Sequence, residues 1–407
     1  MTFEELNLHD NLLEALDYMR FEEATPIQEQ AIPIIQDGRD LIACAQTGTG
    51  KTAAFVLPLV DEMVDAHEEG VTRTLIIVPT RELALQIDQQ IQGFTYFVPL
   101  TSIAVYGGAD QHEHEQQRKA LMQGADIVVA TPGKLISHLN MGYVKFDKIQ
   151  HLVLDEADRM LDMGFVDDIK KIITFLPKKR QTLLFSATMP PKIRQLCKDI
   201  QYQPEEISLA LSKPAEGVLQ AAYLTYPEKK NATLDYLIND KPNYESILIF
   251  TSTKSKVFDI VRALKDKGYT VAGISSDLDQ KERENVLMKF KSKQTRVLVA
   301  TDVLSRGIDI KDIDLVVNYD CPQDAEDYVH RVGRTARAKA TGVALTLISP
   351  DDMYRFSRIE RLIEREVTKL PIPPELGDSP TWNPKGRPPG KGGRGRQKGR
   401  SGQRKKR

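Results

Sequence analysis

The chain has 407 residues and 41% apolar content, which is too long for one ordinary domain and enough for two hydrophobic cores. Its apolar runs are too short to cross a membrane and it does not begin like a secretory signal, so we expect a soluble, cytoplasmic protein without membrane contact. The net charge of -1 hides a strongly basic end, because residues 383–407 contain eleven Lys and Arg and no acid.

Strand-like apolar runs alternate with helix-like segments along residues 1–370, which is typical of parallel sheets built from βαβ units. Residues 209–217, LALSKPAEG, contain Pro and Gly and show no apolar periodicity, so we interpret them as a linker between two groups of strands. The segments DIVVATPGKL and RVLVATDVLSRG resemble each other and hint at a duplicated architecture. We expect the strands at residues 40–45, 74–80, 102–108, 126–132, 151–158 and 182–188, and then at 246–253, 270–276, 296–302, 315–320 and 343–349.

The pattern predicts an α/β fold made of two parallel-sheet lobes and a basic tail. The tail is rich in Gly, Pro, Lys and Arg and has almost nothing apolar to bury, so we expect it to be disordered. It would act either as a solubilising end or as an arm that meets phosphates. The predicted parts are lobe 1 at residues 1–209, the linker at 210–217, lobe 2 at 218–370 and the tail at 371–407.

The segment AQTGTGKT, Ala45 to Thr52, lies between a predicted strand and a predicted helix. A glycine-rich turn in this position points backbone N–H groups at a polyphosphate, and the helix N-terminus adds positive potential. Lys51 would reach the phosphates, and the hydroxyl of Thr52 would contact Mg²⁺. The strict pattern has Gly where Ala45 stands, and the alternative is a glycine turn with a structural role alone.

Three carboxylates, Asp155, Glu156 and Asp158, follow the strand HLVL within four positions. Polar residues at the carboxyl ends of parallel strands meet at the edge where ligands bind. Mg²⁺ needs a carboxylate near the phosphates and keeps several waters, which suits Asp155 as a ligand acting largely through water. Glu156 can orient and deprotonate the attacking water. Alternatively, these carboxylates only stabilise the start of the next helix.

These residues closely resemble the DEAD-box RNA helicases, a family named for the tetrapeptide that Asp155 to Asp158 spell. The resemblance covers about residues 1–365 and follows the family's motif order. It implies two tandem RecA-like lobes, ATP and Mg²⁺ as cofactors, and RNA as a partner that is bound through its backbone without regard to sequence. Ribonucleoprotein or ribosome-assembly partners are compatible with it, and we expect a monomer.

The resemblance places an adenine-reading segment at residues 1–29. Gln28 of ATPIQ would hydrogen-bond the base edge, and Phe3 or Phe21 would stack on its face. Arg20 stands where the family usually has Gly. The implied nucleotide-binding residues are Phe3, Phe21, Thr25, Gln28, Ala45, Gln46, Thr47, Gly48, Thr49, Gly50, Lys51, Thr52, Asp155, Glu156, Gly307, Asp309, Arg334 and Arg337.

Other strand ends match segments that hold RNA in this family. They consist of small residues, hydroxyls and single cations, which suit phosphates and sugars rather than base edges. Contact with the 2′-hydroxyl would favour RNA over DNA. Lys134 replaces a common Arg, and Ser275-Ser276 lies where many members carry His. The implied RNA-binding residues are Pro79, Thr80, Arg81, Gly107, Gly108, Thr131, Pro132, Gly133 and Lys134 in lobe 1, and Thr251, Gln280, Arg283, Thr301 and Asp302 in lobe 2.

The segment HRVGRTARAKATG carries Arg331, Arg334 and Arg337 at a spacing of three, which would place them along one side of a helix. A solvated basic face is one explanation. The resemblance instead makes Arg334 and Arg337 arginine fingers that reach the γ-phosphate across a cleft. The implied catalytic residues are Lys51, Asp155, Glu156, His330, Arg334 and Arg337. The implied coupling residues are Asp158, Ser186, Ala187 and Thr188, with His330 as their partner from lobe 2.

The expected function is that of an ATP-dependent RNA helicase whose lobes close on ATP and RNA together. Each ligand bridges the lobes, so each raises the affinity for the other and RNA stimulates ATP hydrolysis. Short duplexes would be unwound locally, or RNA–protein complexes remodelled. The alternatives are an ATP-dependent RNA clamp or annealing factor, a DNA-directed motor, and a P-loop kinase or GTPase, for which the sequence lacks an Asn-Lys-x-Asp guanine-reading motif.

Overall fold

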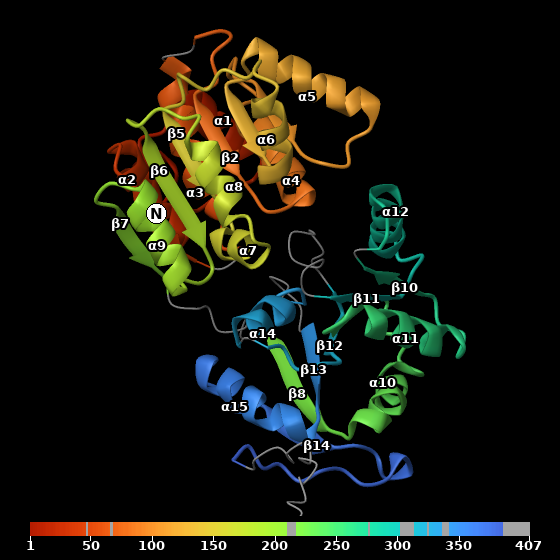
Figure 1. The fold of residues 1–407 in the computed structure, drawn as a ribbon. Helices are drawn as coiled ribbons and strands as arrows, with labels where there is room; N and C mark the ends of the chain where they lie inside the picture. The colour runs from red at the N-terminus through yellow and green to blue at the C-terminus, as the bar shows by residue number, and fades with distance from the viewer. Residues whose placement is uncertain are drawn as a thin grey trace, which may run out of the picture.

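The computed structural model describes residues 1–45, 48–65, 68–209, 217–275, 277–301, 313–323, 325–335 and 342–385, and the side chains of Gln280 and Glu326 lie outside this description. These residues form two lobes, each built on a seven-stranded parallel sheet with helices against it (Figure 1). The predicted α/β fold with two tandem lobes is therefore confirmed. Every helix within the described ranges is too short or too polar to span a bilayer.

Lobe 1 contains strands whose side chains are buried on both faces of the sheet. In β5, Val153 packs into one core cluster, while Leu152 and Leu154 pack into the other, which explains why the strand is a continuous apolar run. The sheet order is β3-β4-β2-β5-β6-β1-β7. Its strands are β1 (Leu41–Cys44), β2 (Thr74–Ile77), β3 (Ser102–Val105), β4 (Ile127–Ala130), β5 (His151–Leu154), β6 (Gln181–Ser186) and β7 (Glu205–Ser208). Its helices are α1 (Asp10–Tyr18), α2 (Pro26–Gln36), α3 (Lys51–Asp65), α4 (Arg81–Phe94), α5 (Gln111–Gln123), α6 (Pro132–Asn140), α7 (Ala157–Asp162), α8 (Val166–Ile173) and α9 (Pro191–Ile200).

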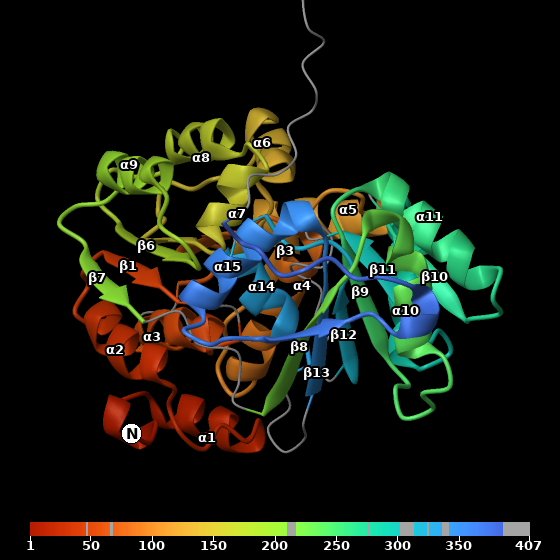
Figure 2. The same ribbon diagram turned by 90° about the horizontal axis from the view of Figure 1, so that it is seen from below.

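Lobe 2 has the sheet order β10-β11-β9-β12-β13-β8-β14. Figure 2 shows its strands between α10 and α11 on one side and α14 and α15 on the other. Its strands are β8 (Val218–Leu224), β9 (Ile247–Thr251), β10 (Val271–Ile274), β11 (Val297–Thr301), β12 (Leu315–Asn318), β13 (Gly342–Ile348) and β14 (Thr368–Pro371). The helices that the structure describes here are α10 (Lys230–Ile238), α11 (Lys254–Lys265), α12 (Gln280–Lys291), α14 (Ala325–Val332) and α15 (Met353–Leu362).

The two sheets have the same strand order, position by position. β4 takes the place in lobe 1 that β11 takes in lobe 2, and β5 and β1 likewise correspond to β12 and β8. The similar segments DIVVATPGKL and RVLVATDVLSRG supply β4 and β11, so the predicted duplication is confirmed. The carboxyl ends of corresponding strands can therefore be compared directly between the lobes.

The predicted start of a disordered tail at residue 371 is wrong. Pro371 ends β14, which pairs with β8 at the edge of the lobe 2 sheet. Further on, the ring of Trp382 lies edge-on to Phe356 at a centroid distance of 6.3 Å, and Nζ of Lys369 lies 4.8 Å from the Trp382 ring centre. Residues 371–385 therefore belong to lobe 2, because Trp382 gives this polar stretch an aromatic anchor on α15.

Candidate functional site

The predicted phosphate-binding segment between β1 and α3 needs glycine at two described positions. Gly48 and Gly50 have φ of +86° and +91°, which other residues adopt only with strain. A Cβ on Gly50 would also lie 2.5 Å from Nε2 of Gln28. Ala45, by contrast, has an ordinary φ and donates its N–H to the carbonyl of Ser186 at 3.0 Å, which explains why Ala can replace Gly there. The predicted residues Gln46 and Thr47 lie outside the described residues.

Lys51 and Asp155 form a buried charge pair at the carboxyl edge of the lobe 1 sheet. Lys51 opens α3, Asp155 directly follows β5, and their side chains are 6% and 5% exposed. Nζ of Lys51 lies 3.8 Å from Oδ1 of Asp155 and has no hydrogen-bond partner among the residues that the structure describes. Burial raises the pKa of Asp155 to about 6, although the charge of Lys51 acts to lower it. A buried ammonium without a hydrogen bond is costly, so this position suits an anionic ligand that would complete it.

Glu156 lies beside this pair in an uncommon backbone conformation. Its φ is +51°, and such left-handed non-glycine residues cluster at functional sites. Oε2 of Glu156 lies 3.0 Å from Nη1 of Arg159, and both side chains are nearly buried. The N–H of Glu156 donates to Oδ1 of Asp155 at 2.8 Å. Arg159, which the sequence analysis did not assign, therefore holds the Glu156 carboxylate in one orientation.

The four predicted coupling residues are assembled within lobe 1. Oδ2 of Asp158 accepts hydrogen bonds from the N–H and the hydroxyl of Thr188, both at 2.9 Å. The Ser186 hydroxyl accepts from the N–H of Asp158 at 3.1 Å and donates to the carbonyl of Thr188 at 2.8 Å. The carbonyl of Ala187 accepts from the Cys44 thiol at 3.4 Å. The pairing of this group with His330, on α14, stays a prediction.

One side chain near the start of α2, that of Gln28, reaches the predicted phosphate-binding segment. The N–H of Thr25 donates to Oε1 of Gln28 at 2.8 Å, and Nε2 of Gln28 donates to the carbonyl of Gly50 at 3.0 Å. Of the two candidate stacking rings, Phe3 is buried in the core of lobe 1, whereas Phe21 keeps part of its surface exposed. The geometry therefore favours Phe21 as the stacking ring and contradicts a direct role for Phe3, whose ring packs edge-on to Phe21 at 6.2 Å.

Arg20 preserves the turn that a glycine would make. Its φ is +60°, and the N–H groups of Arg20 and Phe21 close the end of α1 onto the carbonyls of Asp17 and Leu16. An L-residue in this conformation carries strain of roughly 1–2 kcal/mol. The replacement of the usual Gly therefore leaves the local fold intact at a small cost in stability.

Arg81, at the start of α4, joins two predicted RNA-binding segments. Its Nη1 donates to the carbonyl of Gly108 at 2.9 Å, and its guanidinium lies over the ring of Tyr106 at 4.5 Å from the ring centre. Its Nη2 lies 3.5 Å from a carboxylate oxygen of Glu113. Thr80 caps the same helix, and its hydroxyl accepts the N–H of Leu83. Arg81 therefore connects the segment Pro79 to Arg81 with Gly107-Gly108, while Pro79 itself is buried.

Two crossed ion pairs connect the lobes. Nη2 of Arg81 lies 3.0 Å from Oε1 of Glu284, and Nη1 of Arg283 lies 3.2 Å from Oε1 of Glu82. Arg81 and Glu82 belong to α4, and Arg283 and Glu284 belong to α12, so both contacts bridge lobe 1 and lobe 2. Arg81 and Arg283, for which the resemblance implies contact with RNA, therefore bind carboxylates of the opposite lobe in this structure.

Lys134 lies in the first turn of α6, which Thr131 precedes and Pro132 and Gly133 begin. Nζ of Lys134 donates to Nδ1 of His114 on α5 at 3.1 Å, and the rings of His114 and His138 are 5.3 Å apart. Burial, followed by the charge of Lys134, lowers the pKa of His138 to about 4. His114, which the sequence analysis left unassigned, therefore positions the cation that replaces the usual Arg.

In lobe 2, Thr251 and Thr301 end the adjacent strands β9 and β11 and pair with each other. Thr251 is fully buried and its hydroxyl donates to Oδ2 of Asp320 at 2.8 Å. Solvent does not reach the Thr251 side chain, so the predicted contact of this strand end with RNA could not use that side chain and stays a prediction, whereas Ser252 next to it is exposed. The predicted residues that lie outside the described part are Asp302, Gly307, Asp309 and the side chain of Gln280.

Arg331 and Arg334 do not lie on one helix. α14 ends at Val332, so Arg334 lies in the turn beyond it, and Arg337 lies outside the described residues. Arg331 is buried: its Nη1 donates to Oδ1 of Asn318 at 3.1 Å and to the carbonyl of Asp320 at 2.8 Å. The expectation of three aligned arginines is therefore corrected, because Gly333 follows the last helical residue and Arg331 serves the core of lobe 2.

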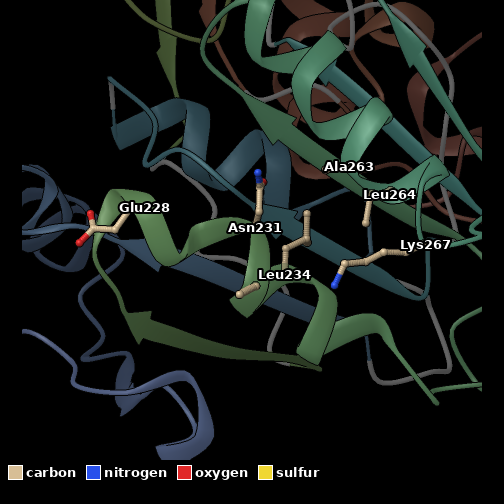
Figure 3. Close-up of a pocket in the computed structure, with 7 residues that line it drawn as sticks. Glu228, Asn231, Leu234, Ala263, Leu264 and Lys267 are labelled. Atoms are coloured by element: carbon tan, nitrogen blue, oxygen red, sulfur yellow. The ribbon is translucent and has the colours of Figure 1, made fainter.

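A separate pocket of about 290 Å³ lies in lobe 2 between α10 and α11 (Figure 3). Leu234 and Leu264 form part of its wall, while Glu228 and Lys267 lie at its ends (Figure 3). None of its lining residues was predicted from the sequence as a site residue. It is distinct from the strand ends described above.

Comparisons with known proteins agree with this geometry. The model of the DEAD/DEAH box helicase family matches residues 25–196, and that of the helicase conserved C-terminal domain matches residues 229–339. A DEAD-box ATP-dependent RNA helicase CshA from Bacillus cereus is 42% identical, and the match covers 91% of this chain and 70% of the relative. The protein of that name from Geobacillus kaustophilus is 41% identical, with coverage of 93% and 80%.

Solved structures show the same fold. Dbp5 of S. cerevisiae bound to RNA and ADP BeF3 matches with a TM-score of 0.81 and 31% identity, covering 92% of this chain and 96% of that one. A DEAD box protein from Methanococcus jannaschii matches with a TM-score of 0.53 and 37% identity, covering 91% and 99%. Because the two family models match one lobe each and these relatives cover both lobes, this chain belongs to the DEAD-box family of ATP-dependent RNA helicases.

Proposed function

We propose that this protein hydrolyses ATP when its lobes close on a single strand of RNA, and that closure separates a few base pairs of a short duplex or displaces bound protein. The observation that carries the proposal is the division of the site between lobes. Lobe 1 holds Lys51, Asp155 and Glu156, whereas Arg334 belongs to lobe 2. A complete site for the γ-phosphate therefore requires both lobes, and an RNA strand that favours closure would stimulate hydrolysis.

The placement of the lobes supports closure. The match to RNA-bound Dbp5 has a TM-score of 0.81 at 31% identity, whereas the match to the Methanococcus protein has 0.53 at 37% identity. Both matches cover at least 91% of this chain. A difference in how the two lobes are placed relative to each other therefore explains the lower score better than a difference in the fold of either lobe. The ion pairs between α4 and α12 fit the same interpretation, because they exist only when the lobes are in contact.

Asp155 fits Mg²⁺ as a second cofactor. Its carboxylate is buried with a raised pKa, so a hard cation there would offset the burial that disfavours its charge. Thr52, in the first turn of α3, would add its hydroxyl, and Lys51 would take a phosphate oxygen with its unbonded Nζ. When bound, the ion would neutralise charge on the phosphates. Glu156, oriented by Arg159, would accept a proton from the attacking water.

The available free energy limits unwinding to short stretches. Each stacked step of a duplex is worth about 1.4 kcal/mol, a figure for DNA that serves as a guide. An ion pair of the kind that joins the lobes contributes about 1 kcal/mol or less. The two ion pairs between the lobes therefore offset the loss of about one step. Contacts to the γ-phosphate would have to supply the rest, so only a few base pairs could be separated before hydrolysis and phosphate release reopen the cleft.

The test is strand displacement of a short RNA duplex by the full chain. We expect ATP to release the labelled strand and RNA to raise the rate of phosphate release, with a smaller effect from DNA of the same sequence. Strand release with ATP but no effect of RNA on ATP hydrolysis would contradict coupling through closure. Faster annealing without displacement would instead support an RNA clamp.

A further inference from the structure

A buried polar network connects α14 to three strands of lobe 2. Nη1 of Arg331 donates to Oδ1 of Asn318 at 3.1 Å, and Nδ2 of Asn318 donates to the hydroxyl of Thr346 at 3.1 Å. The hydroxyl of Tyr328 donates to Oε1 of Gln220 at 2.9 Å. Burial raises the pKa of Tyr328, while a hydrogen bond with Thr346 acts to lower it. Because the one hydroxyl hydrogen of Tyr328 goes to Gln220, Thr346 is the donor in that bond.

The network holds α14 at two points. Arg331 and Tyr328 are three residues apart on α14, so both face the sheet. The strands that they reach, β12, β13 and β8, are neighbours in the sheet. The five side chains are between 0% and 6% exposed, so water cannot replace a bond that is lost. A shift or rotation of α14 would leave a buried polar group unpaired, which is costly, and this gives the helix one favoured position.

Lobe 1 shows that this fold does not need the network. The similar segments DIVVAT and RVLVAT align β4 with β11, and the strand pairing extends this alignment across both sheets. Leu154 then corresponds to Asn318, and Leu184 corresponds to Thr346. Both leucines are fully buried in an apolar core cluster. The first residues of α3 and α10, the α-helices that follow β1 and β8, occupy corresponding places in the same way: Lys51 and Lys230. Since leucine suffices in lobe 1, the polar pair in lobe 2 needs another explanation.

The turn that follows α14 carries Arg334 and is tied to the start of β12. The N–H of Ile313 donates to the carbonyl of Arg334 at 3.2 Å, and the buried hydroxyl of Thr335 donates to the carbonyl of Ile313. Arg334 lies two residues beyond the last residue of α14, so its backbone position follows that of the helix. Figure 1 shows α14 on the side of lobe 2 that faces lobe 1. The placement of α14 on the sheet therefore determines where Arg334 can reach toward lobe 1.

We propose that Asn318 and Thr346 are positioning residues for ATP hydrolysis, which hold α14 on the sheet so that Arg334 meets the γ-phosphate when the lobes close. The inference rests on the proposed function, because it takes Arg334 as the group that lobe 2 brings to the phosphate. Buried polar groups can specify one conformation even where apolar side chains would be as stable. Misplacement of a reacting group by about 1 Å can cost about a hundredfold in rate, so a fixed helix position has a catalytic value that leucine would not supply.

The test separates the hydroxyl of Thr346 from its packing. Thr346→Val removes the hydroxyl and keeps the branched shape, whereas Thr346→Ser keeps the hydroxyl and loses a methyl group. The matched control is Thr233→Val on α10, because Thr233 is also fully buried in lobe 2 and its hydroxyl donates to the carbonyl of Lys229 at 2.9 Å. Tyr328→Phe breaks the network elsewhere and replaces Thr346→Val if that variant does not fold. Each full-chain variant is assayed for thermal stability and for ATP hydrolysis at saturating RNA, alone and combined with Arg334→Ala.

We expect Thr346→Val to lower turnover about tenfold and to change KM for ATP less than about twofold, because lobe 1 binds the nucleotide. Thr346→Ser should keep turnover within about twofold of wild type. Thr233→Val should lose thermal stability but keep wild-type turnover. In the Arg334→Ala background, Thr346→Val should lower turnover no further, because the group that it positions is already gone.

Three results would overturn the inference: wild-type turnover in Thr346→Val, an equal loss of turnover in Thr346→Ser or Thr233→Val, or an equal further loss in the Arg334→Ala background. Wild-type turnover in Arg334→Ala itself is a different outcome. It would show that the proposed function assigns the wrong group to the γ-phosphate, whatever the network does.

Discussion

Neutralising Glu82 and Arg283, separately and together, measures what their contact contributes to lobe closure. Oε1 and Nη1 are 3.2 Å apart, and each side chain is 19% exposed. At an effective dielectric of about 20, the charges at this distance attract by about 5 kcal/mol. Desolvation and the ordering of two long side chains offset most of this attraction, leaving about 1 kcal/mol. The pair should therefore strengthen closure about fivefold.

The assay is RNA affinity, measured by fluorescence anisotropy, for the wild type, Glu82→Gln, Arg283→Gln and the double variant. With a non-hydrolysable ATP analogue, we expect a coupling energy of about 1 kcal/mol between the two substitutions. Without nucleotide the coupling should vanish, because the contact needs closed lobes. Raising the salt concentration should also reduce it, since the pair is partly exposed.

Lys170 and Asp199 supply the control, because they form an ion pair of 2.9 Å within lobe 1 alone. Substitutions there should show no coupling in RNA affinity. If the effects of Glu82→Gln and Arg283→Gln simply add, then Arg283 acts on RNA independently of Glu82. That result would refute the contribution of the ion pair to closure and leave Arg283 as an RNA contact.

Four further changes test other parts of the site. Glu156→Gln should slow phosphate release about a hundredfold or more while RNA affinity with ATP is retained, and unchanged turnover would remove Glu156 from the role of base. Gly50→Ala should weaken ATP binding about tenfold or more in a nucleotide titration, because the new Cβ lies 2.5 Å from Nε2 of Gln28 in a backbone with φ of +91°. Arg20→Gly should raise the free energy of unfolding in urea by about 0.5–1 kcal/mol, since it relieves the strained turn. His138, with its pKa lowered to about 4, stays neutral in the folded state while the unfolded chain binds a proton below about pH 6.5. Stability should therefore fall from pH 6.5 toward pH 4 by about 1 kcal/mol per pH unit, and His138→Gln should flatten this dependence in denaturation curves.

The sequence predicted structure best where the pattern of neighbouring residues determines it. Central strands such as β5 are buried on both faces, so their continuous apolar residues could be identified without the structure. The edge strands β7 and β14, with the sequences EEIS and TKLP, were missed because one side of each meets solvent and their residues are polar or include Pro. β8, with the sequence VLQAAYL, was missed as well, since its Gln and two Ala weaken the apolar signal.

Site residues within short motifs could likewise be predicted, whereas contacts between residues far apart in the sequence could not. Lys51 and Glu156 belong to short motifs whose chemistry can be inferred from their neighbours in the chain. The ion pair between Glu82 and Arg283 joins residues that are 201 positions apart, and no local pattern specifies it. The turn at Arg334 was misjudged because the spacing of arginines suggested a continuous helix, although the Gly333 that follows Val332 was a visible stop signal.

The contrast between Lys51 and Lys230 gives a physical reason why two duplicated lobes would act as one enzyme. In lobe 1 none of the described residues accepts a hydrogen bond from the buried ammonium, so an anionic ligand would lower the free energy of that lobe. In lobe 2 the ammonium of Lys230 already donates hydrogen bonds to the carbonyl of Tyr319 and to Asp320. A nucleotide at this position would therefore not satisfy an unpaired donor. On the proposed function, lobe 2 can then respond to ATP only through contacts made on closure. Because binding coupling is reciprocal, the factor by which ATP raises RNA affinity must equal the factor by which RNA raises ATP affinity.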